Sequence, residues 1–113
     1  MTTVCFFTHN GLPRGFEISG HAGAGEAGYD IVCAAVSSAA YLVANTITDV
    51  IGTDCEVSAD EGYMKLMTDD GQTDSECQHI LEGLRLHIEQ LCEQYPKNIR
   101  ITSVNTGKEQ HHA

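Results

Sequence analysis

The chain has no tryptophan, only two prolines and only six basic residues among its 113. This length supports one compact domain and is too short for two. Sixteen acidic residues against six basic ones give a formal net charge of −10. A field of that sign repels phosphate backbones, so the composition argues against nucleic-acid binding and favours a basic polypeptide as partner.

Long apolar runs and a secretion signal are also lacking. No stretch reaches the ~18–20 uninterrupted apolar residues of a typical membrane span. Residues 1–9 carry no basic segment and only a short apolar run, which is a poor signal peptide and a good first strand. We therefore expect a cytoplasmic protein that does not bind membranes.

Paired cysteines are missing as well. The five cysteines are odd in number and include no CxxC pair: Cys5, Cys33, Cys55, Cys77 and Cys92. This pattern argues against a disulfide framework, a zinc ribbon and a redox centre. His79 and His87 are too far apart on a helix to form a ligand pair. We predict no metal and no cofactor, and a core or half-buried position for every cysteine except Cys33.

The first half of the chain predicts a hairpin followed by a long helix. Residues 3–9 and 16–19 alternate apolar and polar side chains around turn residues. Asp30 is a good N-cap, and the sequence after it stays apolar until Gly52, a helix stop signal. Apolar residues cover most of the circumference of this helix, which predicts a central, buried one.

The second half predicts two more strands, a second helix and a last strand. Residues 55–59 and 63–67 are short strands around a turn, and residues 99–104 alternate again. Residues 73–76 have the spacing of a capping box, and Pro96 ends the helix that they open. One apolar stripe of that helix should be buried: Cys77, Leu81, Leu84, Ile88, Leu91 and Tyr95.

The order ββαββαβ predicts an α+β fold in two layers. One mixed or mostly antiparallel sheet of about five strands would carry both helices on one face. We expect a single domain over residues 1–105 and a frayed tail over residues 106–113.

A cysteine and a histidine are placed so that they can form a catalytic pair. With Asp30 as N-cap, Cys33 lies in the first helical turn, where unpaired N–H groups favour a thiolate. His21 lies twelve residues upstream, at the end of a strand, and can accept and return the thiol proton. Ser37 follows Cys33 by one turn on the same face. The alternative is structural: a buried cysteine is usually a small hydrophobe, and a histidine beside glycines is often a turn residue.

The loop between these residues also matches GxGxxG, through Gly23, Gly25 and Gly28. Such a motif suggests a dinucleotide site when it joins a buried strand to a helix. Here the strand before it is amphipathic, the helix begins with a carboxylate, and a hairpin follows. These features make a nucleotide-binding domain the weakest of the functional hypotheses.

Residues 20–37, GHAGAGEAGYDIVCAAVS, closely resemble the signature of the bacterial ribosomal-processing cysteine protease family, Prp. Length and element order also match, so the resemblance covers nearly the whole chain. Members remove a short N-terminal extension from a large-subunit ribosomal protein, number twenty-seven, by cutting after an aromatic residue. They form homodimers. The resemblance thus implies a cysteine endopeptidase whose substrate is a basic ribosomal-protein precursor and which supports ribosome assembly.

The resemblance also implies roles for individual residues. His21 matches the catalytic histidine and Cys33 the nucleophile, while Asp30 and Ser37 match two supporting positions. The glycine loop with Gly23, Gly25 and Gly28 matches a mobile segment over the active site. Asp30 either caps the helix or orients His21, and Ser37 bonds either near the thiolate or to its own helix. The alternative function is a non-catalytic acidic module for ribosome assembly or peptide binding.

Overall fold

The computed structural model describes residues 1–20, 27–68 and 75–106, with residues 27–30 by their backbone alone. One sheet has the strand order β3-β4-β2-β1-β5, in which only the β1–β5 pair is parallel. The predicted ββαββαβ order and mixed sheet are confirmed. The elements are β1 (Thr2–His9), β2 (Leu12–Ser19), α1 (Ala27–Asn45), the π-helical η1 (Thr46–Ile51), β3 (Cys55–Asp60), β4 (Tyr63–Thr68), α2 (Ser75–Gln94) and β5 (Ile99–Asn105).

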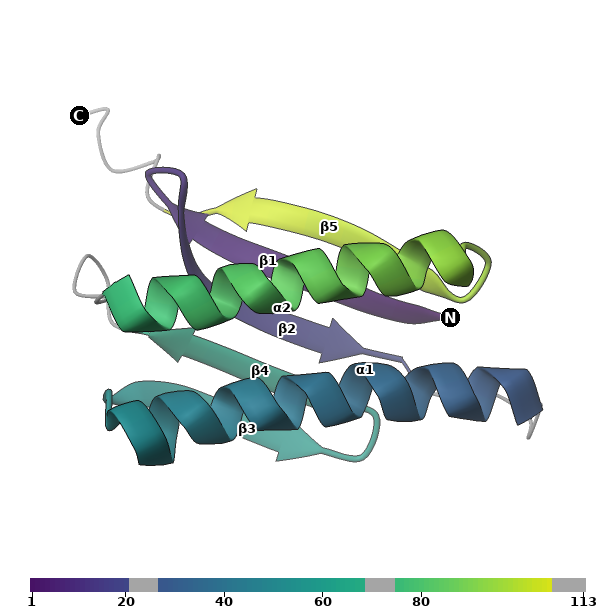
Figure 1. The fold of residues 1–113 in the computed structure, drawn as a ribbon, viewed down its shortest axis with the longest axis horizontal. Coiled ribbons are helices and arrows are strands. Elements are labelled where there is room, and N and C mark those ends of the chain that lie inside the picture. The colour runs from purple at the N-terminus through teal and green to yellow at the C-terminus, as the bar shows by residue number, and fades with distance from the viewer. Residues whose placement is uncertain (21–26, 69–74, 107–113) are drawn as a thin grey trace.

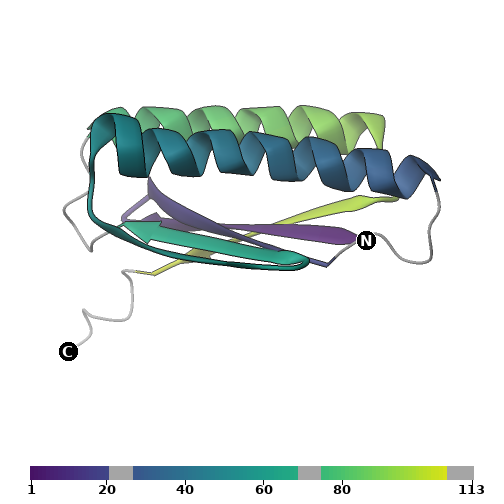
Figure 2. The same cartoon turned by 90° about the horizontal axis from the view of Figure 1, so that it is seen from below.

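Both helices lie side by side on one face of the sheet, as predicted (Figures 1 and 2). The alternation along β1 turns Thr2, Val4 and Phe6 towards the helices, and all three are buried. The stripe of α2 meets them with Cys77, Leu81, Leu84 and Ile88 buried and Leu91 half-buried. The prediction for Tyr95 is wrong, because it lies beyond the helix end at Gln94 and is 36% exposed. The periodicity of strand and helix therefore produces a single core between two layers.

The start of α1 differs from the prediction. The helix begins at Ala27, so Asp30 lies within its first turn and is not the N-cap. Alanine is the best helix former, and an acidic residue is favourable anywhere in the first turn because of the helix dipole. Gly28 consequently belongs to the helix and not to the loop. Cys33 lies in the second turn, beyond the N–H groups that the first turn leaves unpaired.

The prediction of a helix buried on all sides is also wrong. Large apolar side chains of α1 and η1 remain exposed: Ile31 by 63%, Leu42 by 66%, Tyr41 by 49% and Val50 by 78%. The reason is the single layer of helices, which leaves the outer surface of each one uncovered. The stretch Ile31–Ile51 is long and apolar enough to cross a membrane, but its inner face packs on the sheet like that of a core helix.

The predicted stop at Gly52 is confirmed, although the last turns are π-helical. The hydroxyls of Thr46 and Thr48 donate to the carbonyls of Leu42 and Ala44, at 2.7 and 3.0 Å. These bonds lie where the helix widens, and hydroxyls that bond back to the carbonyl four residues earlier often distort a helix. Gly52 then adopts φ +82°, a left-handed conformation that favours glycine.

Close packing of β2 against β4 depends on Gly15. A Cβ atom at this position would lie 2.1 Å from the carbonyl oxygen of Leu66, which is backbone and cannot turn aside. Gly15 also faces Phe7 in the register, directly beside the bulge between Phe7 and Thr8. β2 and β4 can approach each other this closely only because the residue at position 15 has no side chain.

We therefore expect Gly15→Ala to lower the free energy of unfolding by about 2–4 kcal/mol, because β2 and β4 must separate. Gly83→Ala in α2 is the matched control, since nothing lies within 4 Å of a Cβ there. It should raise stability by about 0.5–1 kcal/mol through helix propensity. Urea unfolding followed by circular dichroism measures both, and equal effects of the two substitutions would contradict the close-approach argument.

Candidate active site

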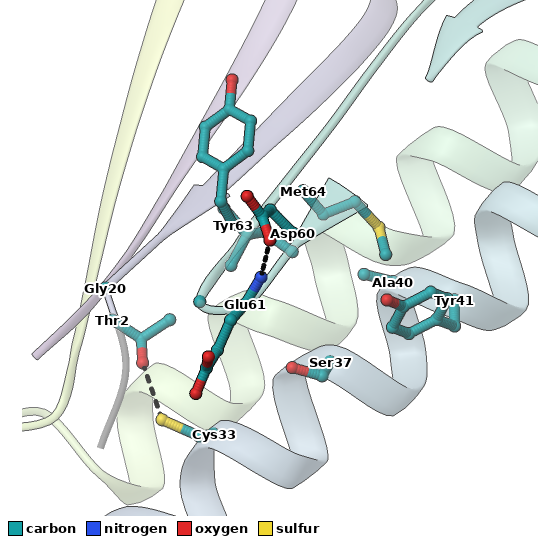
Figure 3. A pocket seen from close by; sticks show the side chains of 12 residues that line it. Thr2, Gly20, Cys33, Ser37, Ala40, Tyr41, Asp60, Glu61, Tyr63 and Met64 are labelled. Carbon is teal, nitrogen blue, oxygen red and sulfur yellow. Dashed lines mark hydrogen bonds between the residues drawn. The ribbon is translucent and has the colours of Figure 1, made fainter. Parts of the chain in front are cut away.

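A cavity opens where several strand ends meet beneath α1. Because β2 runs antiparallel to both β1 and β4, the start of β1, the end of β2 and the β3–β4 turn lie at the same end of the sheet, where strands terminate. The cavity has a volume of about 300 Å³, and its polar lining includes Thr2, Cys33, Ser37, Tyr41, Asp60 and Glu61 (Figure 3). It is at the small end of the range for ligand pockets and has room for one large side chain.

Cys33 presents its sulfur to this cavity from the second turn of α1. The residue is half-buried, and its Sγ lies 3.3 Å from the hydroxyl oxygen of Thr2. Thr2 is only 2% exposed. Sequence reasoning missed Thr2, although a polar residue at a core-facing position of a strand was a signal that could have found it.

Ser37 lines the same cavity one turn after Cys33, as predicted from helical spacing. His21, Gly23 and Gly25 lie outside the described residues, and so does the side chain of Asp30. The pairing of His21 with Cys33 and the closing of the loop therefore stay predictions.

The residue immediately before His21 in the sequence does border the cavity. Gly20 has φ +95°, and a Cβ atom there would lie 2.4 Å from the carbonyl oxygen of Met1. Only glycine fits this turn against the start of β1, because any other residue would meet both strain and a backbone clash. The chain thus leaves β2 at the cavity that holds Cys33.

Two carboxylates stand at the opposite wall of the cavity, on the β3–β4 turn. The backbone N–H of Glu61 donates to the Asp60 carboxylate at 2.8 Å, a bond that fixes the turn. Both residues are exposed, and the Glu61 side chain extends towards the end of the cavity where Cys33 lies (Figure 3). This wall is suited to a cationic group and unfavourable for an anionic one.

The phenol of Tyr63 points away from Cys33 and donates to Glu17 at 2.6 Å (Figure 3). This hydrogen bond, together with desolvation and the charge of Glu17, raises the pKa of Tyr63 above its ordinary value. Tyr63 therefore stays protonated at neutral pH and is not a base for the chemistry of the cavity.

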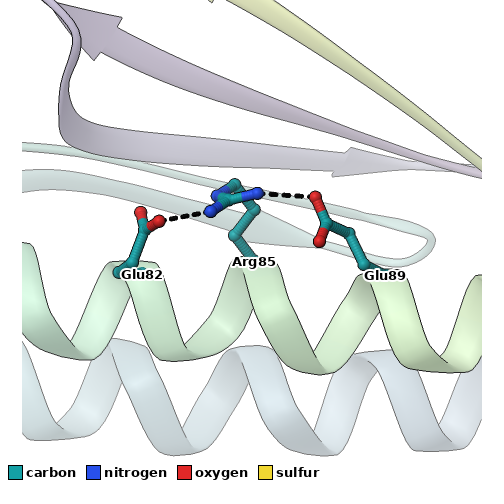
Figure 4. Close-up of polar contacts among 3 residues, drawn as sticks. All are labelled: Glu82, Arg85 and Glu89. Carbon is teal, nitrogen blue, oxygen red and sulfur yellow. Dashed lines mark hydrogen bonds and ion pairs between the residues drawn. The ribbon is translucent and has the colours of Figure 1, made fainter.

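The acidic face of α2 is partly neutralised within the helix. Arg85 bonds Glu82 and Glu89, the latter at 2.6 Å (Figure 4). The hydrogen bond from Arg85 holds the pKa of Glu82 below its ordinary value. A cationic substrate thus has to compete with Arg85 for these carboxylates, whereas Asp60 and Glu61 already face the cavity.

The four other cysteines have structural positions, and the two histidines of α2 are exposed to solvent. The Cys77 thiol donates to the Thr53 hydroxyl at 3.2 Å, and that of Cys92 to the Ile99 carbonyl at 3.4 Å. Cys77 is buried, and Cys5, Cys55 and Cys92 are half-buried, which confirms the prediction for all four. His79 and His87 are both exposed.

The dinucleotide hypothesis is contradicted by the sheet. A dinucleotide fingerprint follows the first strand of a parallel βαβ unit, whereas β2 is antiparallel to both of its neighbours. Within the described ranges, no three His, Cys, Asp or Glu side chains are grouped so that they could hold a metal ion.

Comparison with known sequences identifies relatives over most of the chain. The family model for cysteine protease Prp matches residues 1–100. The ribosomal processing cysteine protease Prp of Bacillus subtilis is 28% identical over 93 residues, which cover 78% of this chain and 83% of the relative. The protein of that name from Staphylococcus aureus is 31% identical over 86 residues, covering 74% and 80%.

Comparison with solved structures gives the same family. The essential ribosomal processing protease Prp of S. aureus in complex with a substrate peptide superimposes with a TM-score of 0.83 at 27% identity, covering 92% of this chain and 100% of the other. The complex of that protease with a covalently linked product peptide gives a TM-score of 0.80 at 28% identity and the same coverage. By its sequence, its fold and the cysteine at its cavity, this chain belongs to the cysteine protease Prp family of ribosomal-processing endopeptidases.

Proposed function

We propose that Cys33 is the nucleophile of this endopeptidase and that His21 is its general base and then its general acid. The observation that carries the proposal is the position of the Cys33 sulfur at a cavity that is also bordered by Gly20, the residue before His21. A thiolate there can attack the carbonyl of a peptide that enters the cavity at this end of the sheet. The covalently linked product peptide of the S. aureus relative supports the same chemistry.

In the proposed reaction, the Cys33 thiolate forms a bond to the scissile carbonyl carbon and the carbonyl π electrons move to oxygen. The tetrahedral intermediate collapses to a thioester as the C–N bond breaks, and the leaving amine takes the proton held by His21. Water then loses a proton to His21 and attacks the thioester, and the sulfur leaves as thiolate. Ser37 lies one turn from the sulfur and, with Asp30, is assigned a supporting role.

We infer that the substrate is the basic N-terminal extension of large-subunit ribosomal protein number twenty-seven, cut after an aromatic residue in support of ribosome assembly. The net charge of −10 and the carboxylates at the cavity favour a cationic peptide. A volume of about 300 Å³ is compatible with one aromatic side chain. The S. aureus relative in complex with a substrate peptide supports a peptide substrate.

We further propose that the protein works in the cytoplasm as a homodimer. None of the five cysteines, all within the described residues, forms a disulfide, as expected in a reducing compartment. The exposed apolar side chains of α1, Ile31 and Leu42 among them, are surface that a second subunit could cover.

Cys33→Ala and Cys33→Ser should each abolish cleavage of a tagged ribosomal-protein precursor, as followed by mass spectrometry, while the fold is kept. His21→Ala should do the same. Loss of the sulfur from a half-buried site costs only ~1–2 kcal/mol, within the usual stability margin.

Cys5→Ala is the matched control, because Cys5 is also half-buried and lies on β1. This variant should cut the precursor at the wild-type rate. Cleavage by Cys33→Ala at the wild-type rate would show that another group is the nucleophile. A wild-type protein that binds the precursor without cutting it would indicate the non-catalytic module instead.

Glu61→Gln should lower kcat/KM for a peptide with lysines beside the scissile bond by about two- to fivefold at low salt, the range of a solvent-exposed ion pair. A matched peptide with neutral residues at those positions should be unaffected. Glu56→Gln removes the same charge from an exposed position on β3 and serves as control. Equal losses for both variants would mean that the net charge, not the cavity wall, attracts the substrate.

Leu42→Asp should convert the dimer to a monomer, because a charge on this 66%-exposed side chain disfavours burial against a second copy. Light scattering after size-exclusion chromatography measures the mass. Glu56→Gln should keep the wild-type mass, and a wild-type protein that is monomeric at micromolar concentration would contradict the proposed assembly.

A further inference from the structure

We propose that the hydroxyl of Thr2 is the hydrogen-bond donor that stabilises the Cys33 thiolate and holds its sulfur at the cavity. The inference rests on the proposed role of Cys33 as nucleophile. It assigns Thr2 to the catalytic machinery, because the hydroxyl touches the reacting atom.

The position of Thr2 is fixed by the sheet. Its backbone N–H donates to the carbonyl of Asn98 at 2.9 Å, and its Cα pairs with Ile99 in the parallel ladder between β1 and β5. The side chain projects from the core-facing side of β1 and is 2% exposed. Pairing with β5 holds the backbone of Thr2, and burial of its side chain keeps the hydroxyl away from solvent.

Within the part of the chain that the structure describes, the hydroxyl of Thr2 and the sulfur of Cys33 are each other's hydrogen-bond partner, 3.3 Å apart. With Cys33 as a thiol, either atom can donate. With Cys33 as a thiolate, the sulfur only accepts, so the single proton of the hydroxyl must point to it. A hydrogen bond to a charged acceptor is about twice as strong as a neutral one, so the contact favours the thiolate over the thiol.

Among the described residues, the hydroxyl of Thr2 is the donor that lies at the sulfur. Cys33 is one turn too far into α1 for the unpaired N–H groups at the helix start. Across the cavity, the carboxylates of Asp60 and Glu61 accept hydrogen bonds and do not donate them. Of the two tyrosines that line the cavity, Tyr63 donates to Glu17, and Tyr41 lies on α1 two turns beyond Cys33.

Thr2 transfers no proton in this scheme. Its bond is strongest while the sulfur is charged, before attack on the carbonyl and again as the sulfur leaves the thioester. It weakens in the thioester, where the sulfur is neutral. The hydroxyl therefore stabilises the charged sulfur through a contact that a hydroxyl-free variant lacks, and such a variant should react more slowly.

The test is the alkylation profile, which is the rate at which iodoacetamide modifies each of the five cysteines at neutral pH, read by peptide mass spectrometry. It is measured together with kcat/KM for a fluorogenic substrate peptide. Thr2→Val keeps the shape of the side chain and removes the hydroxyl. We expect alkylation of Cys33 and kcat/KM to fall roughly three- to tenfold. Thr2→Ser should restore the wild-type profile.

Thr68→Val is the matched control. Thr68 is the other buried polar residue among those described, 1% exposed, and its hydroxyl donates to the Arg14 carbonyl at 2.9 Å, at the opposite end of β4 from the cavity. It should lose stability without any change in the alkylation profile.

A Thr2→Val enzyme with the wild-type profile and the wild-type kcat/KM would overturn the inference. If Thr2→Val fails to fold, Thr2→Ala gives the same comparison with a smaller side chain. Failure of wild-type Cys33 to react faster than the other four thiols would instead refute its role as nucleophile, so the two proposals fail separately.

Discussion

Val32, Val36 and Ala40 pack α1 onto the sheet, and this contact sets the direction of every other side chain of the helix. Cys33 follows Val32 and so lies at the border of the buried stripe, where it is half-buried and lines the cavity. A rotation of α1 by one residue would carry the sulfur into the core or out to solvent. The helix–sheet packing is thus what brings this cysteine to the wall of the cavity.

The antiparallel hairpins supply the surroundings of that sulfur. They return the chain twice to the end of the sheet where β1 begins, which brings Thr2, Gly20 and the Asp60–Gly62 turn to one place. The close approach at Gly15 lets β2 and β4 pair farther along the same strands. The cavity is therefore a consequence of strand order, and small changes in the turns can alter what it accepts while the core stays the same.

Charged side chains are distributed unevenly between α2 and the β3–β4 turn. The excess of acid is partly compensated on α2, where Arg85 bridges two glutamates, whereas the carboxylates of the β3–β4 turn face the cavity. The carboxylates near the cavity are thus not neutralised by Arg85 and are available to a cationic group. The hydrogen bond between Thr2 and Cys33 acts at contact distance within the same cavity.

The sequence by itself determined the elements, because their signals are local. Alternation identified the strands, the single stripe of α2 predicted its buried residues except at Tyr95, and Gly52 and Pro96 marked the helix ends. The run over residues 20–37 indicated the family, and helical spacing placed Ser37 beside Cys33. The start of α1 was misjudged, since a favourable cap at Asp30 does not prevent helix formation at Ala27. The exposed outer face of α1 depended on the number of layers, which helix periodicity does not specify. Only the tertiary structure joined Thr2 to Cys33, 31 residues apart, and set Glu61 across from them, because such contacts depend on strand pairing between distant segments.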